Sequence, residues 1–343
     1  MQKLSYGDQS YTWAKPLNEV VTTLLIGSVI LLGSGYFATS ALADAGEISV
    51  TLEPMEMAIT VDDLPVHGEL QPGMTPSTIT SELITALKDG GSPPVYGFSN
   101  GEPLEWTPTS IEVLRLWRDA GFLLGNHTYS HLDLAQVSVE RFLADVEKMA
   151  ALLAPWIAGQ EGKQLFRYPY LSEGNTLGKR NGVRNYLLTH GYKIAPVTVD
   201  FNDWQWAAAY LQCTKEGNQP ATTWLLKQAI KASRYRLAHA QQLAKLMLGR
   251  DIKHILLLHI SAFSARALPD ILATFKAEGV KFVSLAAALS DPIYAIDPNQ
   301  LMGRDTTFLM QLTDLYNLNT TSLQPLYDGA RLDNTLFTCA RYR

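Results

Sequence analysis

The chain has 343 residues and a formal net charge of −5 that is spread without long runs of one sign, so no nucleic-acid partner is expected. Hydrophobic residues make up 47% of the sequence and aromatic residues 10%, which excludes wholesale disorder. The length fits two small domains or one large α/β barrel.

The N-terminus carries an uncharged apolar run from Val20 to Leu32. This run is short for a membrane span, which takes about 20 residues. The small residues Ala41-Leu42-Ala43 follow it as a cleavage site. We therefore predict a signal peptide over residues 1–43 and an exported protein, periplasmic or secreted, with no membrane span after cleavage. An uncleaved signal anchor is the alternative. Residues 44–56 are expected to form an extended linker.

From Ala58 onward, short apolar runs alternate with longer amphipathic ones. In chain order, strands are predicted at 57–61, 95–98, 122–124, 165–167, 194–199, 255–259 and 281–284. Helices are predicted between them at 77–88, 110–120, 138–153, 177–190, 221–248 and 268–278. This alternation indicates a parallel sheet. Polar residues follow five of the strands, and this favours a barrel over a single crevice.

Two acidic and two histidine residues are candidates for a metal site. Asp62 and Asp63 close the first predicted strand, and His127 and His131 follow the third. Histidines four apart on one helical turn point the same way. With Asp63 they would make a two-histidine, one-carboxylate set with open positions, which suits Zn²⁺, with Co, Mn, Fe or Ni as alternatives. Without a metal, the same residues are a helix cap and two partly exposed histidines.

Three further strand ends carry polar groups. Arg167 could pair with a carboxylate, and the backbone amide of Tyr170 could stabilise an oxyanion. His259 ends a fully apolar strand, and beside a carboxylate such as Asp200 it could act as a general acid. The ordinary alternatives are a surface arginine and a core histidine.

The two cysteines, Cys213 and Cys339, could pair in an oxidising compartment, or they are separate buried thiols. Neither has a cysteine neighbour at the spacing of a zinc ribbon, so a cysteine metal site is not expected.

Five segments, in this order, resemble the motifs of the NodB-like polysaccharide deacetylases, carbohydrate esterase family four. They are T-V-D-D at 60–63, H-T-Y-S-H at 127–131, R-Y-P-Y at 167–170, D-F-N-D-W at 200–204 and L-L-H at 257–259. The resemblance covers residues 57–290 and implies an α/β fold, a distorted (β/α) barrel of seven strands. Residues 205–250 would be a helical insertion, and 291–343 a C-terminal extension.

The resemblance also implies a role for each motif residue. Asp63, His127 and His131 would bind the metal. Asp62 would be the general base, held by Arg167, and His259 the general acid, tuned by Asp200. The amide of Tyr170 would help stabilise the oxyanion. Trp204 and Leu257 would form the hydrophobic wall for the acetyl methyl group.

The sequence departs from the family at the mouth of the site. Leu64-Pro65 stand where Gly-Pro is usual, and Val61 replaces the common Phe. His67 either touches the substrate or is a solvated loop residue. The predicted function is metal-dependent removal of acetyl groups from an N-acetylated or O-acetylated glycan. One alternative is an amidohydrolase of the same barrel acting on a cyclic imide or ureide, and another is a non-catalytic glycan-binding protein.

Overall fold

The computed structural model describes residues 50–106, 109–160, 164–301, 303–332 and 338–342. All of them belong to the unit Ile48–Arg343. The predicted signal peptide and residues 44–49 lie outside the described residues. Among the described residues, no helix combines the length and the apolar character that crossing a membrane requires.

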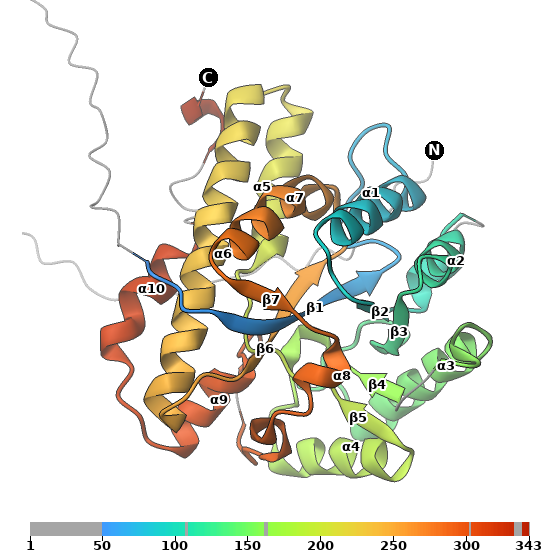
Figure 1. Ribbon diagram of the computed structural model, residues 1–343. Helices are drawn as coiled ribbons and strands as arrows, with labels where there is room; N and C mark the ends of the chain where they lie inside the picture. Colours follow the sequence, from blue (N-terminus) through green and yellow to red (C-terminus); the bar gives the residue numbers. More distant parts are fainter. Residues whose placement is uncertain (1–49, 107–108, 161–163, 302, 333–337, 343) are drawn as a thin grey trace, which may run out of the picture. The chain divides into compact units, whose positions relative to one another are not determined.

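A curled sheet of parallel strands lies at the centre of the described unit, with β1 (Met55–Leu64) between β2 and β6 (Figure 1). The strand order is β5-β4-β3-β2-β1-β6, and β7 pairs with the first residues of β1. The other strands are β2 (Tyr96–Ser99), β3 (Leu123–Asn126), β4 (Gln164–Phe166), β5 (Tyr192–Ile194), β6 (Lys253–His259) and β7 (Val280–Phe282). The predicted barrel with seven parallel strands is therefore confirmed.

The segment after β5 closes the barrel irregularly. The Ala195 N–H still donates to Phe166 in β4, at 2.8 Å, but the Thr198 and Val199 N–H groups donate to Ile255 in β6, at 3.0 and 3.1 Å. Because the chain changes partner between these residues, the strand predicted at 194–199 is wrong in its bounds: the strand is Tyr192–Ile194, and Val199 forms only a single bridge to Leu256 in β6.

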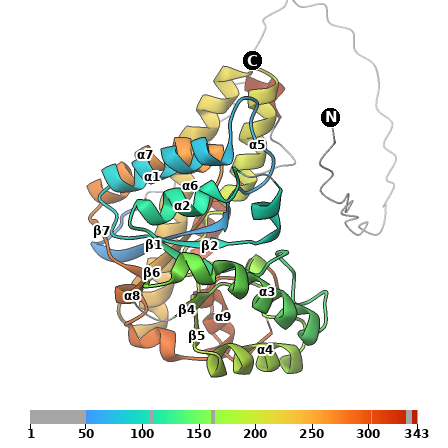
Figure 2. The same cartoon turned by 90° about the vertical axis from the view of Figure 1, so that its right-hand side faces the viewer.

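Helices surround the sheet. In chain order they are α1 (Pro76–Asp89), α2 (Glu112–Asp119), α3 (Val139–Ile157), α4 (Leu177–Thr189), α5 (Asp203–Lys215), α6 (Gln219–Leu248), α7 (Ala262–Ala277), α8 (Leu285–Ala288), α9 (Phe308–Leu315) and α10 (Gln324–Gly329). Figure 2 shows α1, α2 and α7 together on one side of β1, while α3 and α4 lie at the other end of the unit. Connecting loops follow the C-terminal ends of the strands, and ligands gather at these ends in parallel α/β folds.

The alternation of side chains along β1 explains which residues reach the site. Met57, Ile59 and Val61 pack into the core shared with the helices, whereas Ala58 belongs to the apolar cluster inside the barrel. Residues two apart on a strand share a face. Asp62 therefore points into the barrel, and a slip of one residue would turn it toward the helices.

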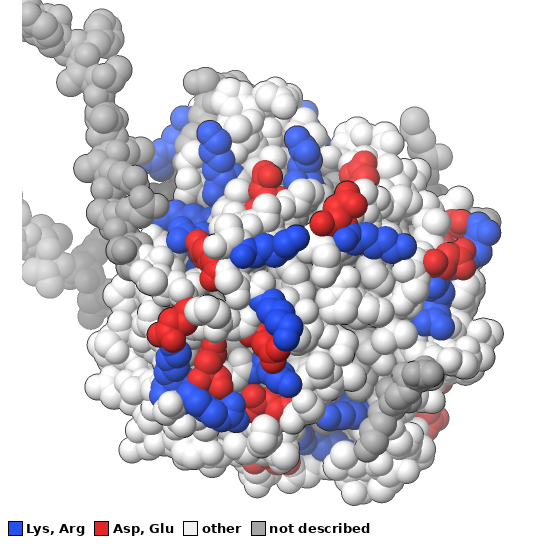
Figure 3. All heavy atoms as spheres, viewed as in Figure 1, with Lys and Arg blue, Asp and Glu red and all other residues white. Residues whose placement is uncertain are grey.

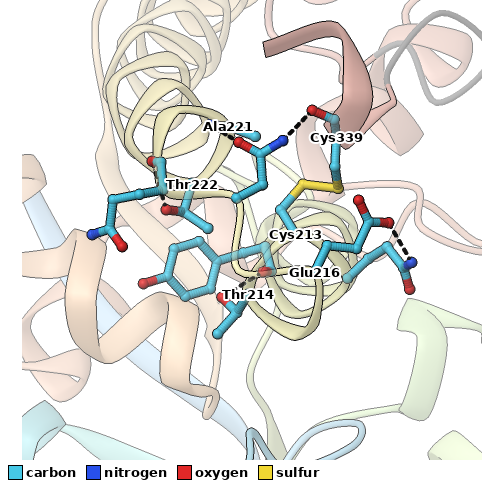
Figure 4. The surroundings of a disulfide bond; sticks show 10 residues. Cys213, Thr214, Glu216, Ala221, Thr222 and Cys339 are labelled. Atoms are coloured by element: carbon cyan, nitrogen blue, oxygen red, sulfur yellow. Dashed lines mark hydrogen bonds between the residues drawn. A yellow bond between two sulfur atoms is a disulfide. The ribbon is translucent and has the colours of Figure 1, made fainter. Parts of the chain in front are cut away.

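The segment predicted to be a helical insertion forms two helices, α5 and α6, and a disulfide ties the C-terminal part of the chain to it (Figure 4). Cys213, near the end of α5, pairs with Cys339 across a sequence separation of 126 residues. The predicted extension also joins the main core, since Leu309, Leu312 and Leu326 are buried in it.

The predicted linker is bound to α6 over its described part. Glu53 exchanges two hydrogen bonds with the Gln241 side chain, each 3.0 Å, and Val50 and Leu52 pack against the core. Residues 50–54 are therefore part of the folded unit.

Basic and acidic side chains lie intermixed on the face shown in Figure 3.

Candidate active site

At the end of β1, the side chains of Asp62 and Asp63 both point to the mouth of the barrel. Asp63 has a left-handed backbone, φ 67°, and the pairing of β1 with β2 shifts register between Val61 and Leu64. In a regular strand, consecutive side chains point to opposite faces. The left-handed residue breaks this alternation, so Asp63 joins Asp62 at the mouth of the barrel.

The two histidines converge through a loop. We expected them on one helical turn, but residues 127–131 follow β3 without helical structure, and Thr128 and His131 have φ of 65° and 52°. His127 Nε2 lies 3.4 Å from Asp63 Oδ1, and His131 Nε2 lies 3.3 Å from the same oxygen. The expected set of three ligand atoms is therefore brought together, by left-handed backbone rather than by helix periodicity.

The chemistry of these three atoms fits a cation. His127 Nδ1 lies 2.8 Å from the Arg167 carbonyl oxygen, so it carries the proton and leaves a lone pair on Nε2. Asp63 Oδ1 is buried and has no hydrogen-bond donor among the described residues. Lone pairs thus face one another at a buried oxygen, an arrangement that a divalent metal would stabilise.

The protonation states agree with metal binding. Burial lowers the pKa of His131 to about 3, which keeps its imidazole neutral, although the Asp63 carboxylate works against this shift. Burial would raise the pKa of Asp63, yet the neighbouring imidazoles, His131 foremost, hold it well below its usual range. Neutral imidazoles and an ionised carboxylate are the ligand forms that Zn²⁺ takes.

Arg167 is a buried residue, not a surface one, and it fixes Asp62. Its side chain is 1% exposed, and its Nη1 lies 3.2 Å from Asp62 Oδ2. It also donates to the Thr60 hydroxyl at 3.1 Å and to the Ala195 carbonyl at 2.6 Å. With three partners, the guanidinium holds the Asp62 carboxylate in one orientation.

His259 is held by Asp203 rather than by the expected Asp200. Its Nδ1 lies 2.7 Å from Asp203 Oδ1, and its backbone N–H donates to Asp203 Oδ2 at 2.7 Å. Burial lowers the pKa of His259, but the Asp203 carboxylate outweighs it, and the pKa is raised to about 10. Asp200 accepts instead from the Asn202 N–H at 2.6 Å, and burial raises its pKa to about 6.

The two predicted wall residues come from β6 and from the start of α5. Leu257 is paired with Thr60, and His259 with Asp62, so these two β6 side chains point into the barrel, one above the other. Trp204 is half-buried in the first turn of α5, next to Asp203.

Tyr170 lies against His131, in the 3-10 turn Pro169–Leu171. Its φ is 57°, and its ring stands edge-on to His131 with ring centroids 4.4 Å apart. The C-terminal extension reaches this turn. The Arg304 guanidinium lies 3.7 Å from the centre of the Tyr170 ring, and the Asp305 N–H donates to the Tyr170 carbonyl at 2.8 Å.

His67 is no solvated loop residue. Its Nδ1 lies 2.6 Å from Asp63 Oδ2, and its ring centroid lies 4.7 Å from that of His259. Sequence reasoning missed this contact, although His67 follows Asp63 by four residues, the spacing that drew attention to His127 and His131.

Comparison with known proteins gives one family. The model of the polysaccharide deacetylase family matches residues 49–195. A chitin deacetylase from Arthroderma benhamiae is 32% identical over 68 residues, which is 20% of this chain and 18% of that protein. The aligned part thus spans less than a fifth of that relative's length.

Solved structures with a similar trace are also found. A family 4 carbohydrate esterase from Streptomyces lividans, in complex with acetate, is 20% identical with a TM-score of 0.44, covering 68% of this chain and 95% of that one. A chitin deacetylase from the fungal pathogen Colletotrichum lindemuthianum is 23% identical with a TM-score of 0.44, covering 71% and 91%.

Proposed function

We propose that this chain, which belongs to the polysaccharide deacetylase family through residues 49–195, is a metal-dependent hydrolase that removes acetyl groups from an N-acetylated or O-acetylated glycan. One observation carries the proposal. A carboxylate held by an arginine, Asp62, and an imidazole held by a carboxylate, His259, are register partners on β1 and β6, beside the ligand set of Asp63, His127 and His131.

The metal site would use Asp63 Oδ1 and the Nε2 atoms of His127 and His131. A divalent ion bound there, for which we propose Zn²⁺, would polarise the acetyl carbonyl and lower the pKa of a water molecule. Three protein ligands with open positions are typical of catalytic zinc.

Asp62 is the proposed general base. An acetamide is attacked only by an activated water, so a carboxylate must take the water's proton as the new C–O bond forms. Arg167 Nη1 lies 3.4 Å from Asp62 Oδ1 and 3.2 Å from Asp62 Oδ2, so the guanidinium fixes the direction of the carboxylate. The arginine is thus a positioning residue.

His259 is the proposed general acid. The C–N bond breaks only if the leaving amine gains a proton. Because Asp203 raises the pKa of His259 to about 10, the imidazole carries that proton at neutral pH. Acetate and the free amine are then the products.

The remaining side chains would hold the acetyl group. Leu257 and Trp204 are the proposed wall for its methyl. The Tyr170 backbone amide is the proposed donor to the oxyanion, because the left-handed turn brings this residue against His131.

An exported location supports a glycan substrate outside the cytoplasm. The Cys213–Cys339 disulfide is a bond that persists in oxidising compartments. The apolar run at 20–32 followed by small residues is the signal on which we base export.

An acetate-release panel tests the proposal. The purified protein, stripped with a chelator and reloaded with Zn²⁺ or Co²⁺, is incubated with chitooligosaccharides, peptidoglycan, acetylxylan and one cyclic imide. We expect acetate from at least one glycan, lost in Asp62→Asn and His259→Ala variants that keep the wild-type circular dichroism. Turnover of the imide alone would favour the small-molecule amidohydrolase instead, and no turnover of any substrate would remove the proposal.

A further inference from the structure

His67 contacts the side of Asp63 that faces away from the other two histidines. Its Nδ1 lies 2.6 Å from Asp63 Oδ2, whereas His127 and His131 approach Oδ1. An ionised carboxylate only accepts hydrogen bonds, so Nδ1 is the donor. The two oxygens of Asp63 are therefore divided between His67 and the proposed metal.

The main chain holds His67 in place for this bond. Its N–H donates to the Ile260 carbonyl at 2.7 Å, and the Ile260 N–H donates back to the Asp62 carbonyl at 3.1 Å. The loop after β1 is thus pinned to the end of β6. Only about a quarter of the His67 side chain is exposed, 27%.

The hydrogen bond from His67 restricts the rotation of the Asp63 carboxylate, which would otherwise turn easily. Rotation about the last torsion of aspartate is soft and broadly populated. Each turn that takes Oδ1 away from His127 and His131 separates the ligand atoms. A donor on Oδ2 removes this freedom and makes binding of an ion less costly in entropy.

We infer that His67 is a positioning residue for the metal ligand Asp63. Its Nδ1–H raises the metal affinity by holding Asp63 Oδ2, and His67 does not itself bind the ion. The inference rests on the metal site of the proposed function. It does not depend on which glycan is the substrate.

A conservative variant distinguishes a positioning role of His67 from a role as a fourth metal ligand. Asparagine places an amide N–H close to where histidine has Nδ1, so it can donate to Asp63 Oδ2 without an imidazole. Alanine removes both. The exposed His190, which bonds the Tyr186 carbonyl through its Nδ1 at 2.8 Å, gives a matched control in α4's C-terminal turn.

The experiment is a Zn²⁺ competition titration against a chromophoric chelator on the full chain, with wild type, His67→Ala, His67→Asn and His190→Ala. We expect His67→Ala to weaken Zn²⁺ binding by about 10- to 100-fold, His67→Asn to restore most of it, and His190→Ala to leave it unchanged. Circular dichroism without metal checks that each variant folds.

Every other outcome overturns the inference. Equal affinity in wild type and His67→Ala refutes positioning while the proposed hydrolase stands. If His67→Asn binds as weakly as His67→Ala, and the Co²⁺ absorption bands also change in both, the imidazole is a ligand. If wild type binds no Zn²⁺, both this inference and the proposed metal site fail.

Discussion

Replacing Asp203 by asparagine removes the negative charge that faces His259 while keeping the shape of the side chain. The carboxylate accepts from His259 Nδ1, from the His259 backbone N–H and from the Ser264 hydroxyl, at 2.7, 2.7 and 2.9 Å. An asparagine presents one oxygen and one NH₂ group, so it cannot accept at both positions.

The size of the effect follows from these contacts. A hydrogen bond to a charged group contributes about 1.5–3 kcal/mol. At about 1.36 kcal/mol per pKa unit, losing that charge lowers the pKa of His259 by about 1–2 units. The alkaline limb of the pH–kcat profile should move down by the same amount, because the general acid loses its proton earlier.

The Asp203→Asn change should also alter how the free energy of unfolding depends on pH. The pKa of His259 is raised from 6.5 to about 10 in the folded protein. The folded state therefore binds the proton more tightly, and the stability gained is full below pH 6.5 and is lost as pH rises toward 10. In metal-free protein, the free energy of unfolding should fall over this window more steeply for wild type than for Asp203→Asn.

Two measurements check the prediction. One is the pH profile of acetate release by Zn²⁺-loaded enzyme, and the other is an NMR pH titration of the His259 ring in metal-free protein. Asp200→Asn is the matched control, since Asp200 bonds the Asn202 N–H and should shift the His259 pKa less. An unchanged ring pKa in Asp203→Asn, or a larger shift in Asp200→Asn, would refute the reasoning.

Three more outcomes are expected. Zn²⁺ at about 100 times its Kd should stabilise wild type by about 2.7 kcal/mol, seen as a higher Tm in thermal melts, and Asp63→Ala should show no such gain. Cys213→Ser combined with Cys339→Ser should lose about 2–5 kcal/mol in urea unfolding, and a reductant should then change nothing further. Arg167→Met leaves the buried Asp62 carboxylate without its partner and should cost about 3–5 kcal/mol in the same assay; an unchanged midpoint would show that Asp62 is not held as described.

The sequence was sufficient to predict which strand ends carry the site. In parallel α/β folds the C-terminal strand ends meet at one edge, so polar residues after apolar runs are brought together by the topology. That rule needs only the strand positions. It holds for Asp62, His127, Arg167 and His259, even where a strand boundary moved by several residues.

The partners of those residues could not be predicted in the same way. Asp200 and Asp203 are three residues apart in D-F-N-D, and either could face His259. Asn202 decides between them, because its left-handed φ of 55° turns the chain so that Asp203 starts α5 against His259. A single backbone angle of this kind leaves no periodic pattern in the sequence.

The left-handed backbone at Asp63 and His131 has an evolutionary consequence. Each of these side chains is needed for the proposed chemistry, yet each sits where a residue with a Cβ costs roughly 1–2 kcal/mol of strain that glycine avoids. Selection for stability and selection for turnover therefore pull these two positions in opposite directions. A descendant freed from the reaction would be expected to drift to glycine there, so glycine at these positions would mark a lineage that has given up the chemistry while keeping the barrel.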